Sequence, residues 1–397
     1  MTIFYRSAAN MKTHHPLKIK IPRVALTITL SIGLSFVFPA FGQYTTSYII
    51  NLNDRSLIQL GNLGGRDTYA ADINDTGQVV GYSTTAEGSE HAFITGTNGE
   101  GIRDLGTLSG SSSRANGINN SGQAVGFFGM VGEPHAFITG PNGVGGTDLP
   151  ILSEFSSVAA GINDAGRVAG YVYEPEGAPT AFITGPHAAG LTPLNIPGGG
   201  YELVRDINGT GQVVGSYNAP GGHNHAFITG PNGVGTTDPG TLGGNYSEAT
   251  AINDVGQVVG QSETTEGTYN AFITGQNGAD MNSLGTLGGF FSAATDINNA
   301  GQVVGHSAMA GGADFRAFIT RANGEDMTDL NSLVNLPDGV VLTSATGINN
   351  LGQIIAVGTV PEPTSYVLML AGLALVGLIV RTKTSAVQAR IKAVPRA

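Results

Sequence analysis

Asparagine and aspartate recur in a short pattern that suits either calcium binding or tight turns. The triplet Asp-Ile-Asn, with a glycine three residues after the asparagine, begins at Asp72, Asp206 and Asp296. Calcium loops also place Asp, Asn and Gly close together, but here the spacing differs from that of an EF-hand loop and no bidentate glutamate follows. Asn or Asp before Gly is also what a tight strand-to-strand turn requires. We therefore favour turn chemistry and assign no metal ligand.

Histidines and paired acids are the other residues that could do chemistry. His91, His135 and His225 occupy equivalent places in a repeated pattern and would converge only if their strand lined a central channel, so we favour satisfied or exposed polar roles over metal ligation. Glu174 and Glu176 lie in a proline-containing segment without an apolar wall to raise one pKa. No hydrolase, metalloprotease or nucleotide-binding motif stands out in the repeats. The sequence predicts no enzyme and no cofactor.

Aromatic residues recur in two predicted loops and are the candidates for ligand binding. Equivalent loops of a ring of repeats fall on one face, so their side chains could stack against sugar rings. Packing between repeats, or scattered surface exposure, explains the same residues and is the reading we favour. The candidates in the loop that follows the double glycines are Tyr69, Tyr201, Tyr246 and Phe290. The second loop carries Phe128, Tyr173, Tyr217, Tyr269 and Phe315.

A repeat with a period near 45 residues must position all of these groups. The Ile-Asn pair recurs at intervals of 45, 44, 45, 45, 45 and 51 residues. Such a period is typical of architectures in which one supersecondary unit cannot bury a core alone. The pairs begin at Ile73, Ile118, Ile162, Ile207, Ile252, Ile297 and Ile348.

One repeat contains four short β-prone runs. In residues 91–127 these are His91–Thr95, Asp104–Leu108, a run ending at Ile118, and Gln123–Phe127. An Asn-Gly hairpin signal at Asn98 separates the first two. Two hairpins in series predict a four-stranded antiparallel meander, which resembles a propeller blade.

Seven such units can be counted if the first begins at Tyr48–Ile50 and the last ends at Gln353–Ile355. This count aligns Ile49 with Phe93. The predicted fold is an all-β, seven-bladed β-propeller covering residues 43–358, with a β-solenoid of parallel strands as the alternative.

Composition restricts the partners. Between Gln43 and Val380 the chain has eight arginines, no lysine and all 29 acidic residues, a formal net charge of 8 − 29 = −21. Such a domain repels phosphate backbones, which excludes nucleic acid as a partner. The chain contains no cysteine, so it is held together by packing without disulfides.

The two ends of the chain predict export. Residues 1–42 combine a basic segment, an apolar run and small residues, as in a secretory signal peptide. Near the C-terminus an apolar run at 366–380, predicted to be a transmembrane helix, precedes a basic tail at 381–397. The tail is expected to stay on the cytoplasmic side of the membrane.

Two resemblances add to these expectations. The His-Ala-Phe triplets at His91, His135 and His225, with the Leu-Gly-Thr-Leu and Ile-Asn-x-x-Gly-Gln-Val-Val-Gly runs, resemble the extracellular HAF-repeat family over residues 48–358. Other units have a different residue at the histidine position, and in the first unit this residue is Ser47. The resemblance implies a bacterial exported protein and assigns no reaction.

The second resemblance covers residues 359–397. Val360, Pro361, Glu362 and Pro363, followed by the apolar run and basic residues, resemble a PEP-CTERM sorting signal. This resemblance implies a Gram-negative bacterium, processing by an exosortase, and export linked to exopolysaccharide and biofilm. The sorting motif is Pro361, Glu362 and Pro363.

The predicted function is that of a non-enzymatic structural or binding component of the cell surface or exopolysaccharide matrix. The expected partners are an exosortase, exopolysaccharide, and the membrane before processing. A polysaccharide lyase or hydrolase on a propeller face, and a calcium-dependent adhesin, are the alternatives.

Overall fold

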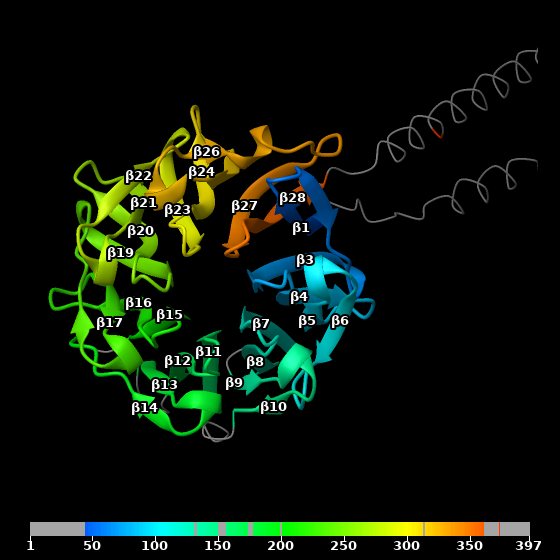
Figure 1. Ribbon diagram of the computed structural model, residues 1–397, viewed down its shortest axis with the longest axis horizontal. Coiled ribbons are helices and arrows are strands. Elements are labelled where there is room, and N and C mark those ends of the chain that lie inside the picture. Colours follow the sequence, from blue (N-terminus) through cyan, green and yellow to red (C-terminus); the bar gives the residue numbers. More distant parts are fainter. Residues whose placement is uncertain are drawn as a thin grey trace, which may run out of the picture. The chain divides into compact units, whose positions relative to one another are not determined.

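The computed structural model describes residues 44–130, 133–149, 156–173, 178–198, 201–312 and 314–360, together with Leu373. Its strands form small sheets that follow one another around a common centre, as in a β-propeller (Figure 1). The predicted signal peptide and the predicted 366–380 span, apart from Leu373, lie outside the described residues. In the described part, no helix is long and apolar enough to cross a membrane.

The described strands make five four-stranded sheets and one eight-stranded sheet. The first sheet contains β3 (Gly64–Ile73), β4 (Val79–Thr85), β5 (Glu90–Thr95) and β6 (Ile102–Gly106). The second contains β7 (Ser112–Ile118), β8 (Ala124–Met130), β9 (Glu133–Ile138) and β10 (Thr147–Asp148). The third contains β11 (Ser156–Ile162), β12 (Val168–Tyr173), β13 (Thr180–Thr184) and β14 (Leu191–Pro193). The fourth contains β15 (Leu203–Ile207), β16 (Val213–Asn218), β17 (Asn224–Thr229) and β18 (Thr236–Thr237).

The eight-stranded sheet consists of two antiparallel halves joined by one parallel pair, Tyr269 with Phe291. One half contains β19 (Gly243–Ile252), β20 (Val258–Thr264), β21 (Tyr269–Ile273) and β22 (Asn282–Gly285). The other contains β23 (Gly288–Ile297), β24 (Val303–Met309), β25 (Phe315–Ile319) and β26 (Thr328–Asp329). The ladders within every half and sheet are antiparallel, whereas the β-solenoid alternative predicted parallel strands.

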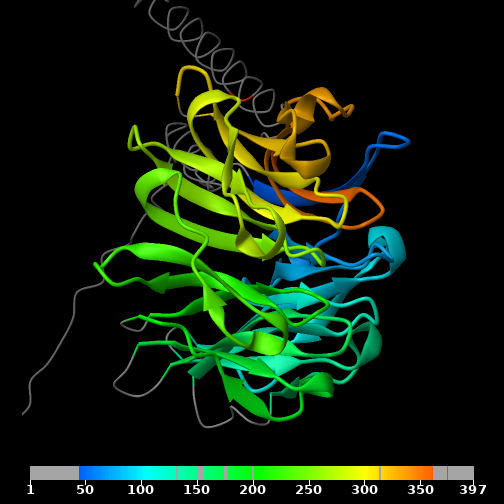
Figure 2. The same ribbon diagram turned by 60° about the vertical axis from the view of Figure 1, so that its left-hand side comes forward.

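The two ends of the described chain share the remaining sheet. Strands β27 (Val341–Ile348) and β28 (Gln353–Val360) are followed outward by β1 (Tyr44–Asn51) and β2 (Ser56–Gln59). Tyr44 pairs with Val360 and Asn51 with Gln353, so β1 and β28 are paired along their whole length. The blue and orange strands lie side by side in both views (Figures 1 and 2). This pairing closes the ring and leaves neither strand edge exposed.

The predicted four-strand unit and the observed sheet begin at different strands. The run beginning at His91 is the third strand of its sheet, and the run ending at Ile118 is the first strand of the next sheet. The four-run unit predicted from the sequence therefore spans two sheets. The alignment of Ile49 with Phe93 is also wrong by one residue, because Tyr48 pairs with Ala356 as Phe93 pairs with Gly81.

The hydrophobic core lies between sheets. Phe93 packs with Ile49 and Ile355 of the preceding sheet, whereas Ile94 packs with Ala115 and other residues of the following one. Alternate residues of the third strand thus serve opposite faces. The phenylalanine of this strand is buried in six units: Phe93, Phe137, Phe182, Phe227, Phe272 and Phe318.

The Asn-Gly pairs form 3₁₀ turns between the third and fourth strands. Asn98, for example, has φ 53°, in the left-handed region that asparagine tolerates. The third sheet has His187 and Ala188 at this place, with φ 56° and 55°. The turns are η1 (Thr97–Gly99), η2 (Pro141–Gly143), η4 (Pro186–Ala188), η5 (Pro231–Gly233), η6 (Gln276–Gly278) and η7 (Ala322–Gly324), and η8 (Leu330–Ser332) precedes β27.

A bulge in the first strand explains the glycine of the Gln-Val-Val-Gly run. In the fourth sheet the register shifts between Val204 and Asp206. A Cβ placed on Gly215 would overlap the carbonyl oxygen of Leu203. The last sheet has Ala356 at this place and carries an additional register shift between Leu342 and Ser344. The glycine is therefore required by close backbone approach.

We predict that Gly215→Ala lowers the free energy of unfolding by about 2 kcal/mol or more, because the added methyl group forces the two strands apart. Chemical denaturation measures the change. Gly146→Ala is the matched control, since its Cβ would meet nothing closer than 3.8 Å. Equal stability of the two variants would contradict this account.

Candidate functional site

A closed ring of asparagine side chains surrounds the central channel. Asn74 Nδ2 donates to the carbonyl oxygen of Asn119 in the next sheet at 3.0 Å, and the same bond continues from sheet to sheet. Asn349 closes the ring by donating to Asn74 O at 3.0 Å. The seven members are Asn74, Asn119, Asn163, Asn208, Asn253, Asn298 and Asn349.

The same asparagines also close their own turns. Asn208 Oδ1 accepts from the N–H groups of Thr210 and Gln212 at 3.1 and 2.9 Å, and its Nδ2 donates to Gln212 Oε1 at 2.9 Å. Each amide therefore serves a turn and a neighbouring sheet at once. The bonds within the turn confirm the turn chemistry predicted from the sequence. The bond to the neighbouring sheet had no signal in the sequence.

A second ring lies one residue further along each turn. Asp75 N–H donates to Asn120 Oδ1, and Asn120 N–H donates to Asp164 Oδ1, at 2.9 and 2.8 Å. The pattern passes through Asp254, Asn299 and Asn350 and returns to Asp75. Gly209 has no side chain to continue it, so the ring is open between Asp164 and Gly209. The turns of all seven repeats line a cavity of about 190 Å³ that is open to solvent.

Three carboxylates join neighbouring first strands. Asp72 Oδ1 accepts from its neighbour Ile73 N–H, while Oδ2 accepts from Ile118 N–H of the next sheet at 2.8 Å. Asp206 and Asp296 make the same pairs of bonds. Burial raises the pKa of Asp72 to about 7 and that of Asp206 to about 6, although the N–H donors act in the opposite direction. Burial likewise raises the pKa of Asp296 well above its usual range.

Among the described residues, no group of three or more His, Asp or Glu side chains is placed to hold a metal ion. The three first-strand carboxylates and the carboxylates of the second ring instead accept hydrogen bonds from the protein, as Asp72 and Asp75 do.

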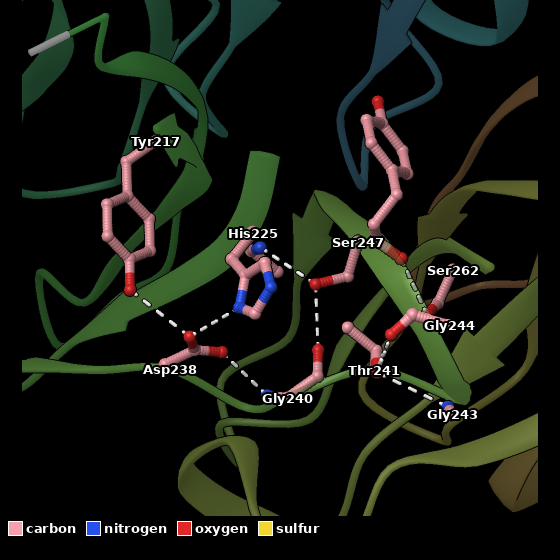
Figure 3. A network of polar contacts seen from close by, with 11 residues as sticks. Tyr217, His225, Asp238, Gly240, Thr241, Gly243, Gly244, Ser247 and Ser262 are labelled. Atoms are coloured by element: carbon pink, nitrogen blue, oxygen red, sulfur yellow. Dashed lines mark hydrogen bonds and ion pairs between the residues drawn. The ribbon is translucent and has the colours of Figure 1, made fainter. Parts of the chain in front are cut away.

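The repeated histidines lie on third strands, away from one another. His91 Nδ1 is 2.8 Å from Asp104 Oδ2, and His225 Nδ1 is 2.7 Å from Asp238 Oδ2, each across to the outermost segment of its sheet. Figure 3 shows that Asp238 also accepts from Tyr217 Oη and from Gly240 N–H. His135 instead stacks on Phe128, with ring centroids 5.7 Å apart. The contacts of His91 and His225 are the satisfied polar roles predicted for histidine, whereas the contact of His135 is aromatic.

The predicted ligand-binding aromatics occupy different register positions. Tyr69 pairs with Tyr82 and stacks on it at 5.3 Å, whereas Tyr246 lies two residues earlier in its strand by strand register. Phe290 and Tyr201 are 59% and 57% exposed. The structure does not bring the four together, and their role in binding stays a prediction.

Aromatics from both predicted loops meet in one cluster on the eight-stranded sheet, and the prediction of loops is wrong here, because the residues lie in strands β19, β21, β23, β24 and β25. Tyr246 contacts Tyr269 with centroids 5.4 Å apart, and Tyr269 lies 6.5 Å from Phe291. His306 and Phe315 complete the cluster around Phe291, at 5.7 and 5.8 Å. All five rings are half-buried, and they connect the two halves of the sheet.

A cavity of about 320 Å³, which we call the wall pocket, lies across the second, third and fourth sheets. Its lining includes Asn116, Phe127, Val158, Ala160, Tyr171 and Arg205. Sequence reasoning missed it, because its residues belong to three different repeats and none is part of a motif.

The sorting motif Pro361, Glu362 and Pro363 lies outside the described residues. The family of the PEP-CTERM protein-sorting motif matches residues 359–383. The chain therefore carries the C-terminal signal of an exported protein that an exosortase sorts to the cell surface. No curated protein matches the sequence closely enough to count as a relative.

Solved structures similar to this chain include the β-propeller domain of the Trilobed protease from Pyrococcus furiosus, which is 12% identical, with a TM-score of 0.51 over 74% of this chain and 88% of that one. An oligogalacturonate lyase in complex with manganese is 10% identical, with a TM-score of 0.48 over 80% and 91%. TolB from Acinetobacter baumannii is 11% identical, with a TM-score of 0.45 over 63% of this chain, which spans 62% of that TolB chain. The first likeness supports the β-propeller fold and says nothing of activity.

We predict that Asn208→Ala costs about 2–4 kcal/mol of unfolding free energy, because the turn N–H groups and the Asn253 carbonyl lose their partner while buried. Thermal or denaturant melts measure it. Asn245→Ala, an exposed position on β19, is the control and should change stability by less than about 0.5 kcal/mol. A neutral Asn208→Ala would show that the ring is dispensable.

We also predict that stability falls as the pH rises from about 4 to 7. The raised pKa values of Asp72 and Asp206 mean that the folded protein keeps protons which the unfolded chain, with a pKa near 3.8, releases. Each carboxyl then lowers the free energy of unfolding by at most about 1.4 kcal/mol for each unit of rising pH. Melts of Asp72→Asn/Asp206→Asn should show a shallower slope, and Asp338→Asn, in an exposed loop, the wild-type slope. Equal slopes in all three proteins would refute the assignment.

Proposed function

We propose that this protein is an exported, exosortase-sorted, seven-bladed β-propeller of the HAF-repeat kind that works as a non-enzymatic binding component of the bacterial cell surface or exopolysaccharide matrix. The observation that carries the proposal is the position of the sorting motif. The match begins at Thr359, within β28, and Val360 still pairs with Tyr44. The ring of sheets is therefore the part of the chain that sorting delivers to the surface.

The blade count is supported by the asparagine ring. Seven amides link seven first strands into one closed cycle, from Asn74 round to Asn349 and back. The fused halves of the eight-stranded sheet each contribute one member, Asn253 and Asn298. Each of the seven strands therefore counts as the inner strand of a separate blade.

Binding is favoured over catalysis because the groups suited to acid–base chemistry are already committed to protein contacts. Asp72, Asp206 and Asp296 each accept two backbone bonds, and His91 and His225 face carboxylates at the surface. The half-buried rings around Phe291 offer flat apolar surface beside polar tips. Such surfaces suit the faces of sugar rings.

We predict that the full-length chain, purified in detergent, is retained by the exopolysaccharide of the producing cells and generates no new reducing ends in it. A co-sedimentation assay with reducing-end analysis in the same tube measures both properties. Bovine serum albumin, another acidic protein, is the control for nonspecific retention. New reducing ends would replace the proposal with a polysaccharide-cleaving enzyme, and no retention would refute binding.

A further inference from the structure

The wall pocket exists because one sheet has small residues where its neighbours have large ones. In strand register, Val158 occupies the place of Tyr69 and Arg114 in the two preceding sheets. There Arg114 covers the Tyr82 ring at 4.3 Å and donates to Glu90, which fills the space between the first two sheets. Ala160, two residues beyond Val158, is equally small. The space beside these residues stays open.

The pocket combines aromatic walls with a few polar groups. Phe127 and Tyr171 are half-buried ring-bearing residues on the second strands of adjacent sheets. Tyr173 contacts the Tyr171 ring edge-on at 5.6 Å and so helps to hold it in place. Asn116 Nδ2 donates to Ala159 O, which leaves Oδ1 as an acceptor. Aromatic rings beside placed polar groups are typical of small-molecule sites of this volume.

The charge of Arg205 is already neutralised. Its Nε and Nη2 donate to Glu248 Oε1 at 3.0 and 2.6 Å. The other oxygen of Glu248 accepts from Tyr246 Oη at 2.8 Å, which fixes the carboxylate beside the guanidinium. A second carboxylate entering the pocket would meet Glu248 as well as Arg205, in a domain of net charge −21.

Burial raises the pKa of Tyr171 to about 12, so its hydroxyl stays protonated and neutral at physiological pH. The pocket therefore offers a neutral phenol, an amide and a compensated guanidinium beside the two rings. Hydroxyl groups match this set as both donors and acceptors.

We propose that the wall pocket binds one neutral pyranose residue of a polysaccharide, stacked against Tyr171 and Phe127 and hydrogen-bonded to Arg205 and Asn116. This inference rests on the proposed function and names the ligand class and site. Glu248 acts as the residue that sets specificity, since it cancels the charge that would otherwise select an acidic sugar.

Isothermal titration of the full-length chain in detergent tests the proposal. The probes are neutral gluco-, galacto- and manno-oligosaccharides, and galacturonate and mannuronate oligomers of equal length. We expect a neutral oligomer to bind at least tenfold more tightly than either uronate oligomer. A uronate that binds as tightly as the best neutral oligomer, or no oligomer binding at all, would overturn the proposal.

Two variants locate the site. Tyr171→Ala should weaken the neutral oligomer at least tenfold, and Ala160→Phe, which fills the cavity, should abolish binding. Val234→Ala is the control, because Val234 is 74% exposed and outside the pocket lining. Tyr201→Ala tests the predicted loop aromatics instead. Unchanged melting temperatures establish that the variants are folded. If Tyr201→Ala weakens binding and Tyr171→Ala does not, the ligand sits on the loop aromatics and the proposal fails.

Glu248→Gln tests the specificity role directly, because a residue with only a structural role would not change the preference between neutral and uronate oligomers. Loss of the carboxylate frees the Arg205 charge, so the preference should shift at least tenfold toward uronate oligomers. An unshifted preference would remove Glu248 as the specificity residue.

Exopolysaccharide retention that is equal in wild type and Tyr171→Ala would refute this pocket while leaving the proposed function intact. No retention by the wild type would refute the function itself.

Discussion

The bond from each asparagine amide to the next asparagine carbonyl is the interaction on which the rest of the structure depends. A buried amide has two N–H donors and an acceptor oxygen, and Asn208 uses them all: the oxygen and one N–H bond within the turn, and the other N–H donates to the next sheet. Local turn geometry and the spacing of adjacent sheets are therefore fixed by one side chain. Because the cycle closes from Asn349 to Asn74, no sheet can shift without breaking bonds at both of its neighbours.

Closure makes the two ends of the chain interdependent. The sheets share their cores, with Phe93 packed against Ile49 and Ile355, so an incomplete last sheet would expose the core of the first. That last sheet needs β1 from the beginning of the described chain and β28 from its end. The paired residues Tyr44 and Val360 lie next to the predicted signal peptide and the sorting motif respectively. Completion of the fold therefore follows synthesis of nearly the whole domain.

Much of this architecture could be read from the sequence because the repeat carries it. The period, the Asn-Gly turns and the buried phenylalanines such as Phe93 are local signals with local causes. The predicted grouping of strands into sheets is wrong, since the sequence of one strand does not show whether it belongs with the preceding or the following strands. The shift from Ile49 to Tyr48 has the same origin, because β1 is aligned by its partner β28 and not by its own residues. The asparagine ring was missed, because its bonds join residues about 45 positions apart.

The wall pocket lies beyond sequence reasoning for a deeper reason. A perfect repeat would fill the space between every pair of sheets in the same way, so a cavity can arise only where the repeats differ. Val158, Ala160 and Arg205 are departures from the pattern, and each looks unremarkable in its own strand. Only the register between strands shows that the small residues face the fourth sheet, whose Arg205 is paired with Glu248 of the eight-stranded sheet. In this fold the shared residues build the scaffold, and the unshared ones create the single-copy chemistry that a ligand can recognise.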